Sequence, residues 1–135
     1  MVNISIEYTG GLHCNAIHEP SKSKLETDAP TDNQGKGEAF SPTDLVATAL
    51  GTCIATTMAI IAERHQLDLK GMTVRVAKEM ANDPRRIGRL ITEVHVPLPP
   101  NHPQRPLLEK TALGCPVHRS LHSDMERPTE FFWEG

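Results

Sequence analysis

The chain has 135 residues and a formal net charge of −3 at pH 7, with its lysines and arginines scattered along the sequence. This balance argues against the basic stripe of a nucleic-acid-binding protein and against a polybasic patch for an anionic membrane. The length predicts a single domain over residues 1–135.

The cysteine content indicates a reducing compartment. The three cysteines, at positions 14, 53 and 115, are too few and too far apart for a secreted disulfide scaffold, and no charged leader with an apolar core follows Met1. We therefore expect a cytoplasmic protein with neither a nucleic-acid nor a membrane partner. In that compartment a disulfide forms transiently, as part of a reaction.

The first 40 residues show the alternation of apolar and polar side chains that is typical of half-buried strands. A hairpin is predicted from strands over Val2–Tyr8 and Leu12–His18, and a short third strand over Lys24–Thr27. A polar loop with the sequence TDNQGKGE follows. The acidic residues in and beside this loop lack the spacing of a calcium site, so they are expected to be solvated: Asp28, Asp32 and Glu38.

A long helix is predicted over residues 41–64. Ser41 suits the N-cap, Pro42 the first helical position, and Asp44 can return a bond to the cap, as in a capping box. No charge occurs between residues 45 and 62, and apolar or small side chains occupy all sides, which predicts a buried helix covered all round. The run approaches the length of a membrane span, but its threonines and the lack of a basic flank favour a core helix. A chain of this size cannot surround such a helix alone, so a partner subunit is expected.

The rest of the chain reads as strands and short helices. The alternation predicts a strand that includes Met72–Val76 and an antiparallel partner over Leu90–Leu98, with the reversal at Asp83 and Pro84. A short helix over Leu107–Leu113, ended by Gly114, and a closing strand over Thr129–Trp133 complete the prediction.

Two of the cysteines occupy contrasting positions. Pro116 suits a first helical position, which places Cys115 at the N-cap, where a helix start stabilises a thiolate and a cationic His118 or Arg119 would add to the effect. From this position alone, Cys115 is equally compatible with a reactive thiol of low pKa and with a side chain that only packs in the core. Cys53 lies about three turns into the long helix, beyond the reach of the helix N-terminus, and burial there raises the pKa of a thiol. A reactive Cys53 would need a cation or a hydrogen-bond donor from another part of the fold.

Metal binding is the alternative from a different class of function. A closed zinc site needs about four ligands, and the two candidate groups hold three each, so solvated histidines are favoured and no metal or other cofactor is expected. Cys14 alone is most simply a small packed side chain. The two groups are Cys115 with His118 and His122, and His13 with Cys14 and His18.

The segment FSPTDLVATALGTCIATTM, the downstream CPVHRSL and the order of strands around them resemble the OsmC family, which includes the organic hydroperoxide resistance proteins. The resemblance covers nearly the whole chain. It implies an OsmC-like α+β fold with antiparallel sheets around a long buried central helix, in an intertwined homodimer. It also implies a stress-defence thiol peroxidase, in which Cys53 attacks an organic hydroperoxide, Cys115 resolves the product, and an external dithiol of the lipoyl type restores both.

The chain departs from the peroxidase members of that family at two positions. In those members an arginine from the N-terminal sheet region and a glutamate at the start of the long helix activate the attacking cysteine. Here no arginine precedes Arg64, and Thr43 stands at the glutamate position beside Asp44. These departures resemble the less characterised OsmC-like branch.

The departures leave the activation of Cys53 open. The expected supporting residues are Asp44, Thr43, His118 and Arg119, and the candidates for a substitute cation are Arg119, Lys22, Lys24 and His13. The alternative function is a dimeric ligand- or metal-binding protein with little or no peroxidase activity.

Overall fold

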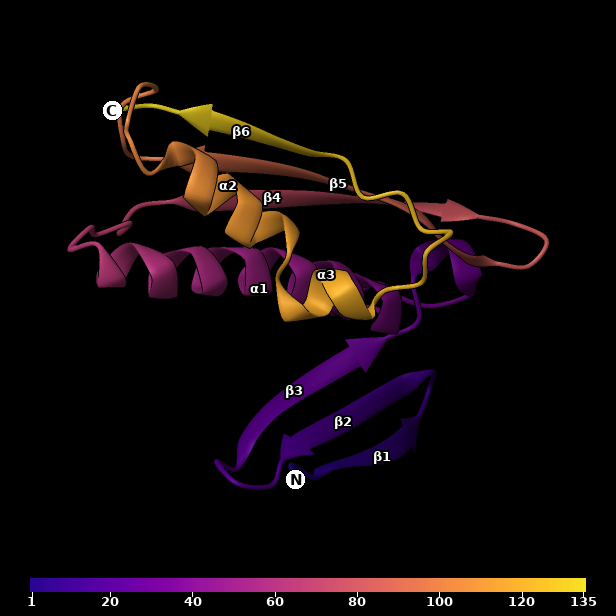
Figure 1. Ribbon diagram of the computed structural model, residues 1–135. Coiled ribbons are helices and arrows are strands. Elements are labelled where there is room, and N and C mark those ends of the chain that lie inside the picture. The colour runs from indigo at the N-terminus through magenta and orange to yellow at the C-terminus, as the bar shows by residue number, and fades with distance from the viewer. The chain divides into compact units, whose positions relative to one another are not determined.

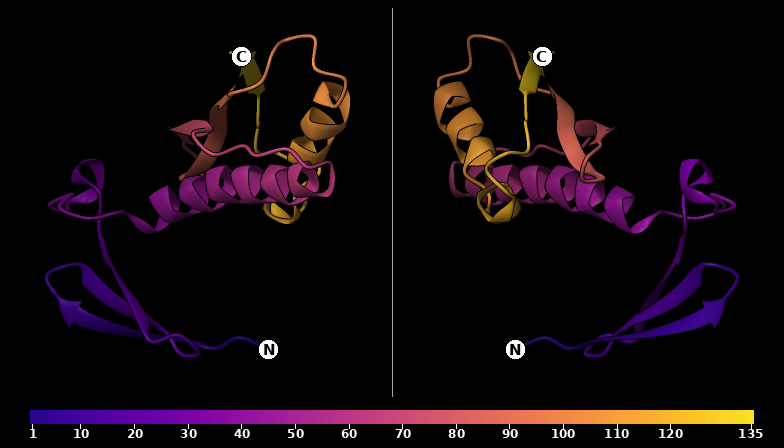
Figure 2. Two further views of the ribbon diagram at one scale, coloured as in Figure 1. Left: turned by 90° about the vertical axis from the view of Figure 1, so that its left-hand side faces the viewer. Right: turned by 90° about the vertical axis from the view of Figure 1, so that its right-hand side faces the viewer.

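The computed structural model describes residues 1–135, which form two compact units, Met1–Val46 and Ala47–Gly135 (Figures 1 and 2). Each unit contains one three-stranded sheet, and the boundary falls within the long helix α1 (Pro42–Arg64). The mixed α+β architecture predicted from the sequence is confirmed.

The N-terminal unit is an antiparallel meander of β1 (Ile4–Gly10), β2 (His13–His18) and β3 (Ser23–Asp28). Gly11 and Leu12, both with φ 61°, form the turn of the predicted hairpin, and Gly10, with φ 91°, ends β1. Glycine adopts such positive φ angles without steric cost. A 3-10 helix, Thr31–Asn33, lies in the polar loop that follows β3.

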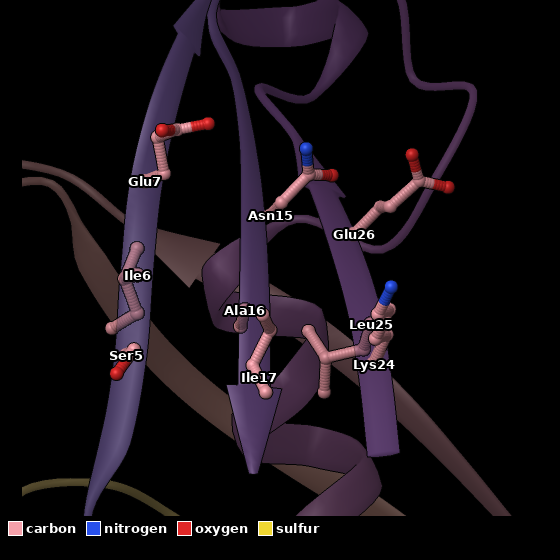
Figure 3. A pocket seen from close by; sticks show the side chains of 9 residues that line it. All are labelled: Ser5, Ile6, Glu7, Asn15, Ala16, Ile17, Lys24, Leu25 and Glu26. Atoms are coloured by element: carbon pink, nitrogen blue, oxygen red, sulfur yellow. The ribbon is translucent and has the colours of Figure 1, made fainter. Parts of the chain in front are cut away.

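One face of this N-terminal sheet is apolar and uncovered within the unit. Ile4, Ile6 and Tyr8 share a face of β1, and the register places Cys14 on that same face, opposite Tyr8. The three β1 side chains are 59%, 70% and 62% exposed, and Leu25 of β3 is 45% exposed. A hollow of about 570 Å³ lies against all three strands, and most of the residues that line it, which Figure 3 labels, belong to the opposite face of the sheet. No cysteine lines it.

The end of this sheet holds an ionic cluster around a buried Asp28, which corrects the expectation of a solvated Asp28. Asp28 is only 6% exposed, its Oδ1 lies 2.6 Å from Nδ1 of His13, and its Oδ2 accepts the Glu38 N–H at 3.0 Å. Glu26 Oε1 lies 3.2 Å from Nε2 of the same ring. The β2–β3 register pairs His13 with Asp28, a contact that local spacing does not reveal. The hydrogen bonds to Asp28 and then Glu26 raise the pKa of His13, and the bond to His13 lowers the pKa of Asp28 although burial opposes it.

The cluster predicts a pH-dependent stability. Because the pKa of His13 is raised above 6.5 in the fold, its stabilisation is complete below that value and is lost as pH rises through the raised pKa. Because the pKa of Asp28 is lowered, its stabilisation is present above 3.8 and is lost as pH falls through the lowered pKa. We expect His13→Gln to lower the melting temperature most between these two values, and progressively less in alkaline buffers.

Thermal unfolding in a series of buffers from about pH 5 to pH 9 measures this difference. His18→Gln, at an exposed histidine of the same strand, is the control. A destabilisation by His13→Gln that stays constant across the series would contradict the ionic origin of the effect.

The C-terminal unit contains a second sheet in the order β4-β5-β6 (Figure 1). β4 (Thr73–Ala81) and β5 (Arg86–Val96) form the predicted antiparallel pair. β6 (Thr129–Trp133) has the predicted bounds but pairs with β5 in parallel. A parallel pair requires a crossover connection. Here the crossover contains α2 (Arg105–Leu113) and α3 (Pro116–Ser120).

The helices of this unit cover one face of the sheet (Figure 2). A Cβ at Gly51 of α1 would lie 3.0 Å from Cγ2 of Val76, so only glycine fits where α1 approaches β4 without displacing this neighbour. On the same sheet face, Trp133 donates a hydrogen bond from Nε1 to Glu109 of α2 at 3.1 Å. The fully buried side chains of this core include Leu50, Ile54, Met58, Leu90, Val94, Val96 and Leu108.

Helix α1 begins with the predicted capping box. The Asp44 N–H donates to Ser41 Oγ at 3.1 Å, and the Ser41 N–H donates to Asp44 Oδ2 at 2.9 Å. These two bonds satisfy donors that the first turn of a helix leaves without partners.

Only one stripe of α1 is buried within the single chain, and the predicted cover on its other sides depends on a partner subunit. Away from the stripe, Thr52 and Thr56 are exposed, and Ile60 is 48% exposed. By length and composition α1 would also qualify as a membrane span, a property it shares with core helices. The buried stripe consists of Ala47, Leu50, Gly51, Ile54, Met58 and Ala62.

Candidate active site

The two cysteines of the sequence motifs come together within the C-terminal unit. Cys53 lies on α1 and is half-buried, and Cys115 precedes α3 and is fully buried. Both are free thiols, and they hydrogen-bond to each other. Packing of α3 against α1 therefore brings two sulfurs from distant segments into contact.

Cys115 is the N-cap of α3, as the sequence predicts. Its backbone is extended, with φ −64° and ψ 154°, Pro116 starts the helix, and its Sγ accepts the N–H of His118 at 3.4 Å. The preceding helix α2 ends at Gly114, which is also the predicted end. Consecutive N–H groups in the first turn of α3 serve the two sulfurs, since the Val117 N–H bonds to Cys53.

These contacts give the two thiols opposite tendencies to ionise. Burial raises the pKa of Cys53, but the Val117 N–H, the Cys115 thiol and the Thr57 hydroxyl outweigh it, so the pKa lies below that of an ordinary thiol. Burial also raises the pKa of Cys115, and the bond and charge of Cys53 raise it further, against the His118 N–H. Cys53 is thus the thiol that ionises first, and Cys115 keeps its proton.

This order is the reverse of what helix position alone suggests. The N-cap position does supply an N–H to Cys115, but full burial and the neighbouring sulfur have the larger effect. The donor that Cys53 lacks in the sequence is the Val117 backbone, which only the tertiary fold places beside it.

The expected cationic helpers on α3 have other roles. Burial, followed by the positive charge of Arg127 and then Arg119, lowers the pKa of His118, so its ring is neutral at pH 7. The Arg119 Nε donates to the Gly114 carbonyl at 2.8 Å. Arg127, which the sequence motifs did not indicate, donates from Nη1 to the carbonyl oxygens of His118 at 2.9 Å and Leu121 at 3.4 Å, and so holds the end of α3. Its distance in sequence from the CPVHRSL motif gives no indication of this role for Arg127.

The other candidates belong to the N-terminal unit. Thr43 Oγ1 lies 3.2 Å from Ser41 Oγ, and Asp44 is the capping-box acid. Lys22 and Lys24 are exposed, and the charge of His13 is matched by two carboxylates. Within the C-terminal unit, the groups that lower the pKa of Cys53 are N–H, S–H and O–H dipoles, and no charged side chain is among them.

The structure holds no group of three or more His, Cys, Asp or Glu side chains arranged to bind a metal ion. His13 and Cys14 are consecutive on β2 and therefore point to opposite faces of the sheet. His122 is exposed, and its Nδ1 accepts the Asp124 N–H at 3.0 Å. In both candidate groups, the histidine and cysteine side chains are therefore not arranged as the ligands of one metal ion.

Comparison with known proteins places the chain in a family. A search of curated proteins found no match. The OsmC-like protein family matches residues 35–127. The crystal structure of an osmotic stress induced and detoxification response protein from Psychrobacter arcticus 273-4 is 40% identical, with a TM-score of 0.92 over 97% of this chain and 96% of that one.

Two further structures share the fold at lower identity. An organic hydroperoxide resistance protein OsmC from Legionella pneumophila is 15% identical, with a TM-score of 0.79 over 98% of this chain and 96% of that one. An OsmC-like protein from Mycoplasma pneumoniae is 16% identical, with a TM-score of 0.78 over 100% and 98%. These two establish the shared fold alone. From the family match and the 40% identical structure, the chain belongs to the OsmC-like protein family.

Proposed function

We propose that this protein is a cytoplasmic thiol peroxidase that reduces organic hydroperoxides in oxidative stress defence, with Cys53 and Cys115 as its redox pair. The observation that carries the proposal is the contact between a thiol that ionises readily, Cys53, and a buried protonated thiol, Cys115. A thiolate is the reactive form of cysteine, and a second thiol beside it supplies the group that closes a disulfide. The name of the Legionella pneumophila protein, organic hydroperoxide resistance protein, supports this class of substrate.

The proposed cycle has three steps. The Cys53 thiolate attacks the distal oxygen of the hydroperoxide, the O–O bond breaks, and an alcohol leaves while Cys53 becomes a sulfenic acid. Cys115 then displaces the hydroxyl from the sulfenic sulfur, so a disulfide and water form. An external dithiol, for which we propose the lipoyl type, reduces the disulfide by thiol–disulfide exchange.

Peptide mapping tests this proposal. After one equivalent of cumene hydroperoxide, the wild-type protein should yield a Cys53–Cys115 bridged peptide and one equivalent of alcohol. Cys14→Ser, at the third cysteine, should give the same bridge. Recovery of Cys14 in the bridge, or of no bridge, would disprove the redox pair. Turnover with dihydrolipoamide against a monothiol then identifies the class of reductant.

The substrate should be bulky and apolar. No charge occurs between Leu45 and Ala62, and Ala49 and Leu50 lie one turn before Cys53. Each buried CH₂ contributes about 0.8 kcal/mol, and one methylene discriminates by roughly tenfold or more in a formed pocket. We expect a higher kcat/KM for cumene or tert-butyl hydroperoxide than for hydrogen peroxide, measured with one dithiol at one pH. Equal values would show that the apolar surroundings of Cys53 are only core packing.

We also propose that the protein is a homodimer. The apolar face of the N-terminal sheet, with Ile4, Ile6 and Tyr8, and the side of α1 that bears Ile60 are both uncovered in one chain. Exposed apolar side chains grouped on one face of an element are typical of an interaction site. An obligate dimer interface typically buries about 2,000 Å² or more, so dissociation should accompany unfolding. Light scattering coupled to size exclusion should give the mass of a dimer, and a folded monomer at micromolar concentration would contradict it.

A further inference from the structure

We propose that Arg127 is a positioning residue for closure of the disulfide: it ties helix α3, and with it Cys115, to strand β5 of the C-terminal sheet. This inference rests on the proposed function, because it concerns the step in which Cys115 joins Cys53. It gives a part in that step to a residue that lies outside both cysteine motifs.

Helix α3 has little of its own to hold it in place. It contains five residues, Pro116–Ser120, and none of them is buried. A helix this short is marginal in water, because its first turn fixes several residues for a single hydrogen bond. No glycine ends it, since the residue that follows, Leu121, is extended with φ −81° and ψ 152°. The position of α3 therefore depends on hydrogen bonds to its two ends.

The Arg127 guanidinium holds the C-terminal end of α3. Its Nη1 donates to the carbonyl oxygen of His118 at 2.9 Å and to that of Leu121 at 3.4 Å. The last carbonyls of a helix have no partners within the helix, so these two bonds satisfy groups that α3 itself leaves open. A hydrogen bond from a charged donor is roughly twice as strong as one between neutral groups.

The backbone on either side of Arg127 is fixed to β5. The Glu126 carbonyl accepts the Leu90 N–H at 2.8 Å, and the Pro128 carbonyl accepts the Thr92 N–H at 2.9 Å. Figure 1 shows this segment, in yellow, between α3 and β6. The Arg127 side chain thus reaches α3 from a backbone that the sheet holds still.

The bond made by Arg119 is of a different kind. The Arg119 Nε donates to the Gly114 carbonyl at 2.8 Å, which ties α3 to the residue directly before Cys115. Both partners of that bond belong to the same short segment, residues 114–119, so the bond does not attach this segment to the sheet. Arg127 supplies such an attachment.

His118 connects the Arg127 contact to Cys115. The His118 carbonyl accepts the bond from Arg127, and the His118 N–H donates to Cys115 Sγ at 3.4 Å. Cys115 is also the N-cap of α3, so a displacement of the helix breaks this N–H bond and moves the Cys115 backbone. A disulfide needs its sulfurs at about 2.05 Å in a defined geometry. The rate of closure therefore depends on how well Cys115 is held in place.

Arg127 acts through this backbone contact and not through its charge on the thiols. Burial, which raises the pKa, has the largest effect on both Cys53 and Cys115, and Arg127 is not among the groups that shift either pKa. The charge of Arg127 acts instead on His118, whose pKa is lowered by burial and then by Arg127.

The test measures closure of the disulfide independently of the rate of peroxide attack. Wild type, Arg127→Gln and Arg75→Gln are oxidised with one equivalent of cumene hydroperoxide in a series of concentrations of dimedone, which traps sulfenic acids. Mass spectrometry gives the ratio of the Cys53–Cys115 disulfide to trapped Cys53. The trapping rate constant is measured in a Cys115→Ser background, with and without Arg127→Gln. Arg75, exposed on β4, is the control for loss of one positive charge from the same unit.

We expect the closure rate to fall roughly tenfold or more in Arg127→Gln, the size expected for lost hydrogen bonds from a charged donor. In Arg75→Gln the rate should stay within about twofold of wild type. Arg127→Lys keeps a charged donor, is the milder change if Arg127→Gln does not fold, and should lie between the two. Hydrogen exchange should be faster in residues 116–121 of Arg127→Gln and unchanged in β5.

Equal closure rates in Arg127→Gln and Arg75→Gln would overturn the positioning role and leave the redox pair intact. Slower closure without faster exchange in residues 116–121 would also overturn it, because the effect would not pass through α3. The failure of the proposed function is a different result. A wild-type protein that yields neither the disulfide nor trapped Cys53 after peroxide would overturn the redox pair, and the role of Arg127 with it.

Discussion

Replacement of Cys53 by serine is expected to abolish peroxide consumption, with a loss in kcat/KM on the order of 10³-fold or more. The hydroxyl of serine remains protonated under conditions in which the Cys53 thiol, held by the Val117 N–H and the Cys115 S–H, ionises. Serine is also close to cysteine in size, so the packing of α1 should be retained. Consumption of cumene hydroperoxide with a dithiol donor measures the effect.

Cys14→Ser is the matched control, because it removes a thiol from β2, outside the redox pair. It should keep most of the activity. Full activity in Cys53→Ser would show that the chemistry lies elsewhere, and the ligand- or metal-binding alternative would then become the better account. Elemental analysis for bound zinc would test the metal branch of that alternative.

The second large effect concerns the core of the C-terminal unit. Leu108→Ala should lower the free energy of unfolding by about 2–5 kcal/mol, the range for removing a buried leucine side chain. Leu108 is fully buried on α2, whereas its neighbour Leu107 is 38% exposed on the same helix. Leu107→Ala makes the same chemical change with the same effect on helix propensity, and it should cost less than about 1 kcal/mol.

Urea unfolding followed by circular dichroism compares the two variants. If Leu108→Ala itself costs less than about 1 kcal/mol, the burial assigned to Leu108 does not describe the protein in solution. A loss of the same size in both variants would instead indicate that Leu107 is covered by a partner chain.

The elements of this fold could be predicted from the sequence because their signals are local. Ser41 and Asp44 are three residues apart, and their reciprocal bonds follow from that spacing. The hairpin turn at Gly11, the helix end at Gly114 and the bounds of Thr129–Trp133 likewise depend on neighbouring residues.

What could not be predicted depends on contacts between distant segments. The parallel pairing of β6 with β5 is decided by the crossover connection. It could not be predicted because apolar and polar residues alternate in the same way in parallel and antiparallel strands. The His13–Asp28 contact depends on strand register. The ease with which Cys53 ionises comes from the Val117 N–H, so a rule based on position within a helix gave the wrong order for the two thiols.

The crossover between β5 and β6 has a bearing on where damaging substitutions should occur. It carries Cys115 (Figure 1) and is hydrogen-bonded to the sheet at both ends: the Glu134 N–H donates to the Val96 carbonyl at 2.9 Å where it starts, and the Thr92 N–H donates to the Pro128 carbonyl at 2.9 Å where it ends. Between these ends, Glu109 of α2 accepts a hydrogen bond from Trp133 Nε1 at 3.1 Å. The segment that carries Cys115 is thus held at both of its ends. Loss of one of these contacts would lengthen the segment that is free to move, and Cys115 would then move away from Cys53. Substitutions near the C-terminus would then resemble redox mutants, although no cysteine had been changed.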